Sequence, residues 1–95
     1  MWKAASQDNV ALVFTVRDKF GELESLYAKS TGDRLTVPLE LMADCQIWKV
    51  LLDRFLRGDY RIKEGELGAV RRFAQWTVDV KRFLCGQEPK KVVWS

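Results

Sequence analysis

Apolar residues between Pro38 and Arg57 recur with the period of one helical face, and this stretch predicts the central helix of the domain. One face is built at spacings of four, three, four and three residues: Leu41, Cys45, Trp48, Leu52 and Phe55. Other apolar residues widen that face or lie behind it: Leu39, Met42, Ala43, Ile47, Val50, Leu51 and Leu56. A helix that is apolar around most of its circumference must be covered by several neighbouring elements.

A second periodic stretch precedes the central one. Ser6 or Asp8 can cap a helix that runs to about Lys29. Its apolar positions occupy one face: Leu12, Val13, Val16, Phe20, Leu23 and Tyr27. Residues 10–16 are also rich in residues that favour strands, and Val10, Leu12, Phe14 and Val16 stand at alternate positions, so a strand there is the alternative. The apolar face continues without a break to Tyr27, which favours the helix.

A third helix is predicted from about Glu66 to Cys85, after a loop at residues 58–65. Its apolar face repeats the spacing of the central helix: Ala69, Phe73, Trp76, Val80 and Phe83. We expect the largest side chains of the two helices to be buried: Trp48, Leu52, Phe55, Phe73, Trp76 and Val80. Gly86 is suited to end the third helix, and Pro89 prevents its continuation.

These elements predict an all-α fold, a bundle of three main helices with an extended C-terminal tail. The length of 95 residues suits one domain, so we assign residues 1–95 to a single helical domain. Residues 1–7 are expected to be frayed, except that Trp2 should dock on a surface. Residues 87–95 form the expected tail.

The composition is that of a globular domain, with 47% hydrophobic and 31% charged residues. No segment reaches the roughly 18 consecutive apolar residues of a membrane-spanning helix. The first residues lack the basic-then-apolar order of a signal peptide. We therefore expect an intracellular, cytoplasmic chain that does not act at a membrane.

The residues available for chemistry give little support to catalysis. The chain has no His and two Cys, Cys45 and Cys85, which predicts neither a disulfide framework nor a zinc site. Asp44 is the carboxylate nearest the apolar face of the central helix, and we expect it to pair with a Lys or Arg. The sequence contains no phosphate-binding glycine loop. We expect no catalytic residue, cofactor, metal or small-molecule substrate, and no enzyme activity.

The width of the apolar faces instead predicts protein contacts. Helices this short leave apolar area uncovered in an isolated bundle. We expect a regulator, adaptor or assembly subunit that forms a homodimer or binds a protein partner. The candidate partner-binding residues are the large apolar ones near the two ends: Trp2, Val92, Val93 and Trp94.

The distribution of charge keeps nucleic-acid binding as the alternative. The formal net charge of +3 comes entirely from residues 58–95, which carry eight basic and five acidic side chains. The candidate phosphate-binding residues lie on the third helix and the tail: Arg71, Arg72, Arg82, Lys90 and Lys91. The loop before the third helix is longer than the turn of a helix-turn-helix, so that motif is not expected.

Overall fold

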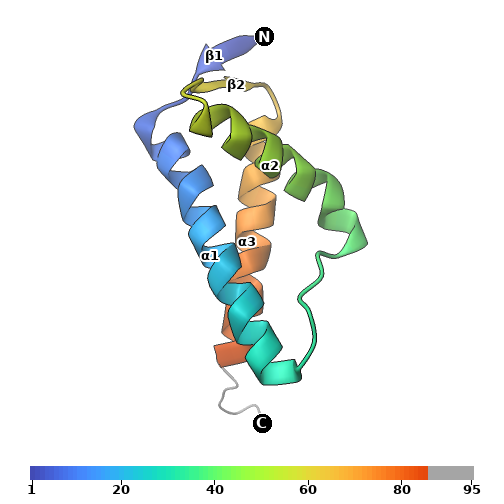
Figure 1. Cartoon of the computed structure of the whole chain (residues 1–95). Helices are drawn as coiled ribbons and strands as arrows, with labels where there is room; N and C mark the ends of the chain where they lie inside the picture. Colours follow the sequence, from blue (N-terminus) through green and yellow to red (C-terminus); the bar gives the residue numbers. More distant parts are fainter. Residues whose placement is uncertain (86–95) are drawn as a thin grey trace.

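Three helices carry the fold, and a two-stranded sheet closes one end of them (Figure 1). This computed structural model describes residues 1–85. The helices are α1 (Gln7–Thr31), α2 (Met42–Leu56) and α3 (Glu66–Cys85), and a short 3-10 turn, η1 (Leu39–Leu41), precedes α2. The strands are β1 (Trp2–Ala4) and β2 (Arg61–Lys63). The prediction of a three-helix bundle is confirmed.

The ends of α1 follow from local chemistry. Ser6 has an extended backbone, and its hydroxyl accepts a hydrogen bond of 3.2 Å from the backbone N–H of Asn9, which caps the first turn. The helix ends at Gly32, whose φ of 78° lies in the left-handed region that glycine adopts without strain. Residues 10–16 lie inside this helix, so the strand alternative is wrong there.

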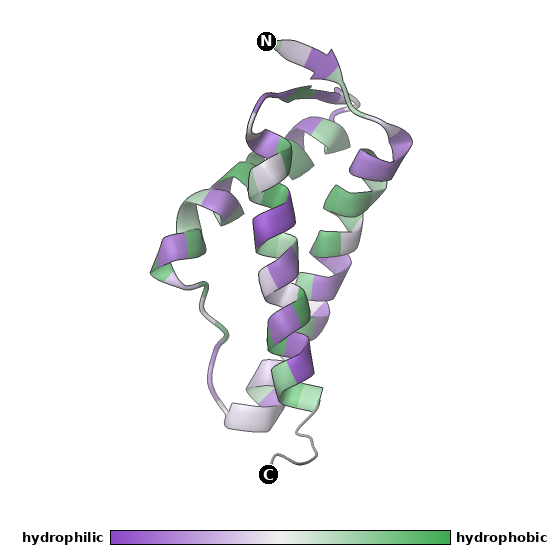
Figure 2. Cartoon of the chain, turned by 180° about the vertical axis from the view of Figure 1, so that it is seen from behind, coloured by the Kyte–Doolittle hydropathy of each residue, from purple (hydrophilic) through white to green (hydrophobic). Residues whose placement is uncertain are grey.

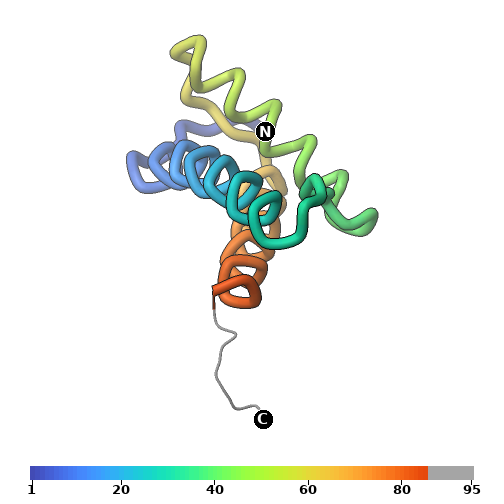
Figure 3. The backbone as a smooth tube through the Cα atoms, turned by 60° about the horizontal axis from the view of Figure 1, so that its bottom comes forward, coloured from blue at the N-terminus to red at the C-terminus, as the bar shows by residue number. Residues whose placement is uncertain are grey.

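The three helices do not run side by side over their whole lengths. Figure 1 shows that α1 and α3 point in the same direction, whereas α2 runs obliquely back toward the sheet. The segment 32–38, which we call the linker, returns from the far end of α1 to the start of α2 (Figures 1 and 3). Leu35 in the linker is buried, so this segment packs against the helices.

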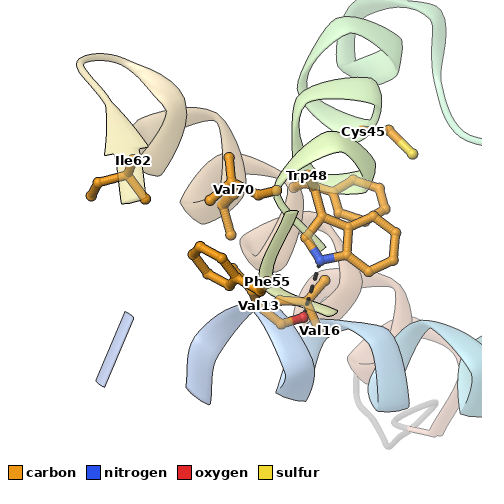
Figure 4. Close-up of a cluster of buried hydrophobic side chains, with 9 residues drawn as sticks. Val13, Val16, Cys45, Trp48, Phe55, Ile62 and Val70 are labelled. Carbon is orange, nitrogen blue, oxygen red and sulfur yellow. Dashed lines mark hydrogen bonds between the residues drawn. The ribbon is translucent and has the colours of Figure 1, made fainter. Parts of the chain in front are cut away.

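Trp48 of α2 connects all three helices at the centre of the core (Figure 4). Its indole N–H donates a hydrogen bond of 3.1 Å to the backbone carbonyl of Val13 in α1. Its ring lies 5.1 Å from the ring of Phe73 in α3 and 6.1 Å from that of Phe20 in α1, measured between centroids. Phe55 and Leu51 complete the buried face of α2.

The buried face of α3 differs from the predicted one. The buried residues are Ala69, Val70, Phe73 and Thr77. Trp76 and Val80 are half-buried, and Phe83 is 77% exposed. A repeat of seven residues drifts by about 20° per heptad around a helix of 3.6 residues per turn. The predicted positions therefore turn away from the core toward the end of α3. Leu52 of α2 was also expected in the core and is half-buried.

The start of the chain is ordered, so the expectation of frayed residues 1–7 is wrong. β1 pairs antiparallel with β2, with Trp2 opposite Lys63 and Ala4 opposite Arg61. The backbone N–H of Ala5 also donates to the carbonyl of Tyr60 at 2.8 Å. The buried side chain of Ile62 joins this sheet to the core. Two strands of three residues give too short a pattern to be read from sequence.

The core assignment predicts a sharp contrast between two leucines. Leu51 is 0% exposed and Leu39 is 83% exposed. Leu51→Ala should lower the free energy of unfolding by about 2–5 kcal/mol, because it removes buried methyl groups and leaves a cavity. Trp48→Ala or Phe73→Ala should lower it by about 3–5 kcal/mol for the same reason. Leu39→Ala is the matched control and should change it by less than about 0.5 kcal/mol. Urea denaturation measures these values, and equal losses for the two leucines would contradict the assignment.

Candidate protein-interaction surface

The ion pair between Asp44 and Arg72 marks the point where α2 ceases to cover α3. Asp44 lies in the first turn of α2, and Arg72 donates from Nε and Nη2 to its two carboxylate oxygens, each at 3.0 Å. These hydrogen bonds hold the pKa of the Asp44 carboxyl below its usual range. Asp44 is therefore the charged partner of an Arg, as expected, and is not set up as a general base.

Beyond this pair the bundle contains two helices and the linker. α3 continues for thirteen residues past Arg72, to Cys85, and α1 continues to Thr31. We call residues 19–31 of α1 and 76–85 of α3 the distal pair. Apolar positions continue along α3 into this part, below the start of α2 (Figure 2). The distal pair therefore has apolar flanks that α2 is too short to cover, and a groove lies on each side of it.

The groove on the linker side, which we call the linker groove, has a volume of about 370 Å³. Its apolar lining comes from α1, α3 and the linker: Tyr27, Leu35, Pro38, Trp76, Val80 and Phe83. The ring of Trp76 lies 5.7 Å from that of Phe73 and 6.4 Å from that of Phe20, so the floor belongs to the aromatic core. Asp79 supplies a carboxylate to the lining, and its Oδ1 accepts a hydrogen bond from Gln75.

The groove on the other side of the distal pair, which we call the basic groove, differs in charge. It has a volume of about 330 Å³ and an apolar floor that includes Leu23 and Val78. Its lining also includes three cations: Lys19, Lys81 and Arg82. The amine of Lys81 lies 3.7 Å from a carboxylate oxygen of Glu22, and both side chains are largely exposed. The two grooves are therefore similar in size and opposite in the sign of their charges.

Trp2 lies at the opposite end of the molecule, where its ring packs on its own chain. Three cations lie near its centroid: Arg54 at 4.5 Å, Lys63 at 4.7 Å and Arg61 at 5.0 Å. Glu66 accepts two hydrogen bonds from Arg54, at 2.9 and 3.0 Å. The ring is 41% exposed. Trp2 thus docks on a surface, as expected, and its part in binding a partner stays a prediction.

The other predicted binding residues are only partly brought together. Arg71 and Arg82 are exposed on α3, and Arg72 is held by Asp44. The predicted residues of the tail lie outside the described range: Lys90, Lys91, Val92, Val93 and Trp94. Sequence reasoning missed the linker groove, because it did not reveal that α2 is ten residues shorter than α1, at 15 against 25.

The cysteines of the described chain are free thiols. Cys45 is buried and Cys85 is exposed. Burial raises the pKa of the Cys45 thiol, which keeps it protonated and unreactive. Among residues 1–85, no group of three or more His, Cys, Asp or Glu side chains is placed to hold a metal ion. No helix in this range has the length and apolar content needed to cross a membrane.

Comparison with known proteins adds no relative. A scan against protein-family models, a search of curated proteins and a search of solved structures each found no significant match. The surface must therefore be interpreted from its own geometry.

The ion pair beneath Trp2 predicts a dependence of stability on pH. The hydrogen bonds from Arg54 lower the pKa of the Glu66 carboxyl. A carboxyl whose pKa is lower in the folded chain stabilises the fold at pH values above its unfolded pKa, about 4, and loses that contribution as the pH falls through the folded pKa. Glu66→Gln should therefore lower the free energy of unfolding at neutral pH by about 1–3 kcal/mol, and this loss should shrink in acid.

The control is Glu64→Gln, which removes an exposed carboxylate two residues away. It should change the free energy of unfolding by less than about 0.5 kcal/mol at either pH. Urea denaturation of the unsubstituted chain and of both variants, at about pH 7 and about pH 2, gives the change in the free energy of unfolding for each variant at each pH. A loss for Glu66→Gln that is the same at both pH values would contradict the role of its charge.

Proposed function

We propose that this chain is a small, non-enzymatic protein-interaction module that self-associates through the linker groove. The observation that carries the proposal is that, among the described residues, α2 does not extend along the distal pair, so no third helix covers it. A pair of helices with apolar flanks needs further elements to cover them, and a second copy supplies them in a form that is complementary by symmetry. Two distal pairs packed together make a four-helix arrangement, which is a stable way to bury such flanks.

The chemistry of the linker groove supports a protein partner. Its floor contains Trp76, whose ring is fixed by Phe20 and Phe73, and its rim contains the exposed ring of Phe83. Rigid aromatic side chains lose little conformational entropy when a partner covers them, and they are the usual anchors of protein interfaces. In the basic groove, a two-fold contact would bring Lys19, Lys81 and Arg82 of two copies together, which is unfavourable. We therefore assign the interface to the linker groove.

Binding is favoured over catalysis by the state of the titratable groups. Asp44 and Glu66 are both paired with arginines, and the thiol of Cys45 is buried. A catalytic site requires a group with a tuned pKa beside a cavity that admits a substrate. Among the described residues, these groups are held in structural pairs or in the core instead.

Nucleic-acid binding is the second candidate. Arg71 and Arg82 are exposed and stand eleven residues apart, which is three turns, so they share one side of α3. Phosphates could meet both residues along one strand. Two observations weigh against it: Arg72 is held by Asp44, and Lys81 lies beside Glu22. The cationic surface on the described part of α3 is thus smaller than the sequence indicates.

Self-association should depend on the linker groove. The average mass in solution should rise with concentration from that of one chain toward that of two, as measured by analytical ultracentrifugation. Phe83→Asp should weaken self-association at least about tenfold, because it places a charge at the rim of an apolar interface. Phe83 is 77% exposed, and circular dichroism of the variant checks that the helical content is kept.

The matched control is Leu56→Asp, since Leu56 is 60% exposed at the end of α2 that lies toward the sheet. It should leave the association constant unchanged. A chain that stays monomeric at every attainable concentration, both at full length and without residues 90–95, would remove the proposal, and so would equal effects of the two variants.

The second candidate predicts binding that is sensitive to salt. The chain should bind single- or double-stranded oligonucleotides at low ionic strength, and the logarithm of the affinity should fall linearly with that of the salt concentration. The double variant Arg71→Glu, Arg82→Glu should abolish this binding, whereas Arg17→Glu on α1 should only weaken it. Fluorescence anisotropy measures both, and the absence of binding to either kind of probe at low salt would exclude the candidate.

A further inference from the structure

The two grooves of the distal pair lie next to the point where the chain leaves the described structure. Both contain residues from the last turns of α3: Val80 and Phe83 line the linker groove, and Cys85 lines the basic groove. Ten residues follow Cys85. The first four include one acidic residue, Glu88, and the last six include two lysines and then three apolar residues: Lys90, Lys91, Val92, Val93 and Trp94. Residues 90–95 are therefore both basic and apolar, and the described part of the chain ends beside two apolar grooves.

Charge distinguishes the two grooves as binding sites for such a segment. The basic groove presents Lys19, Lys81 and Arg82, which would repel the two lysines of the tail. The linker groove presents the carboxylate of Asp79 next to an apolar floor. An apolar anchor for this floor and a positive charge for this carboxylate are both present in residues 90–95. The linker groove is the complementary one.

The length of the tail allows it to reach this groove on its own chain. Trp76 and Phe83 are separated by seven residues of α3, a distance of about 10 Å along the helix axis. Residues 86–89 provide up to about 13 Å of chain for a reversal of direction, and residues 90–95 span up to about 20 Å when extended. A short connection also keeps the local concentration of the segment in the millimolar range, far above that of a second molecule.

We infer that residues 90–95 bind in the linker groove of their own chain, with Trp94 as the apolar anchor and with the lysines beside Asp79. The segment and a second copy then compete for the same surface. Self-association is held weak while the tail is bound and becomes stronger when the tail leaves. This consequence for self-association rests on the proposed function, whereas binding of the tail itself does not.

Trypsin cleavage of the full-length chain tests the inference, because Lys90 and Lys91 lie within the bound segment. The products cut after these residues are followed by mass spectrometry under native conditions, at a concentration where the chain is monomeric. A synthetic peptide of residues 86–95 gives the intrinsic rate. Cleavage in the folded chain should be at least about tenfold slower than in the peptide, since a protease acts on the open population. Trp94→Ala should remove this protection, judged against a peptide with the same substitution.

Two acidic residues give a matched pair of charge variants. Asp79→Lys should accelerate cleavage after Lys90 and Lys91 severalfold, because it repels the tail from the linker groove. Asp18→Lys, at an exposed position of α1 outside both grooves, should not. The double variant Trp94→Ala, Asp79→Lys should be cleaved no faster than Trp94→Ala alone, since both changes act on one contact. Equal effects of the two charge variants would overturn the assignment to the linker groove.

Other outcomes are equally decisive. Cleavage of the folded chain at the intrinsic rate of the peptide would overturn the inference. Protection that vanishes on dilution, together with weaker self-association of Trp94→Ala, would place the tail on a second copy and overturn binding within one chain. Stronger self-association of Trp94→Ala supports the competition. The effect of Phe83→Asp on mass, measured in a chain without residues 90–95, tests self-association in the absence of the tail, so failure of the proposed function would be recognised independently.

Discussion

The hydrogen bond from the indole of Trp48 to the carbonyl of Val13 fixes how α2 lies on α1. A buried indole N–H without an acceptor is costly, so the ring cannot rotate or shift along α1 without a loss. The same ring packs against Phe73, and through it α3 takes its place beside the other two helices. The remaining core forms around this contact, including Phe55 and Val70. One amphipathic side chain, that of Trp48, thereby fixes how the three helices are placed against one another.

The unequal lengths of the helices give the molecule two structurally different ends. At the sheet end, three helices meet, and Arg54 and Glu66 pair in a largely buried position. At the other end, α1 and α3 extend past α2, and the linker covers only part of their exposed flanks. Most of the buried core lies at the first end, and the linker groove and the basic groove lie at the second. The buried core and the two grooves therefore occupy different parts of one small chain.

The sequence predicted the helices well, because their signals are local and periodic. Ser6, Gly32 and Pro38 act through neighbouring backbone atoms, and they mark boundaries close to those observed. Pairing of Asp44 with a basic residue could be expected from its place beside the apolar face. The identity of its partner, Arg72, could not be predicted, since it depends on how two helices are aligned.

The features that the sequence did not reveal depend on long-range geometry. Phe83 continues the apolar period of α3, yet it is 77% exposed in the part of α3 that extends past Arg72, the partner of Asp44 in the first turn of α2. The linker groove is made by Tyr27, Leu35 and Val80, which come from three separate segments. Its existence depends on the path of the linker, which carries no periodic pattern. Each of the two strands likewise forms only by pairing with the other, which lies far away in the sequence.

That small sheet has a consequence for the order in which the chain folds. Trp2 pairs with Lys63, so β1 and β2 enclose about sixty residues between them. Closing a loop of this length costs on the order of 3–4 kcal/mol of chain entropy, more than three residue pairs return on their own. The contact between Trp48 and Val13 divides this loop and brings the ends near each other first. We therefore expect the strands to join last during folding and to separate first during unfolding, so that protection of their amides would measure whether the helices are fully assembled.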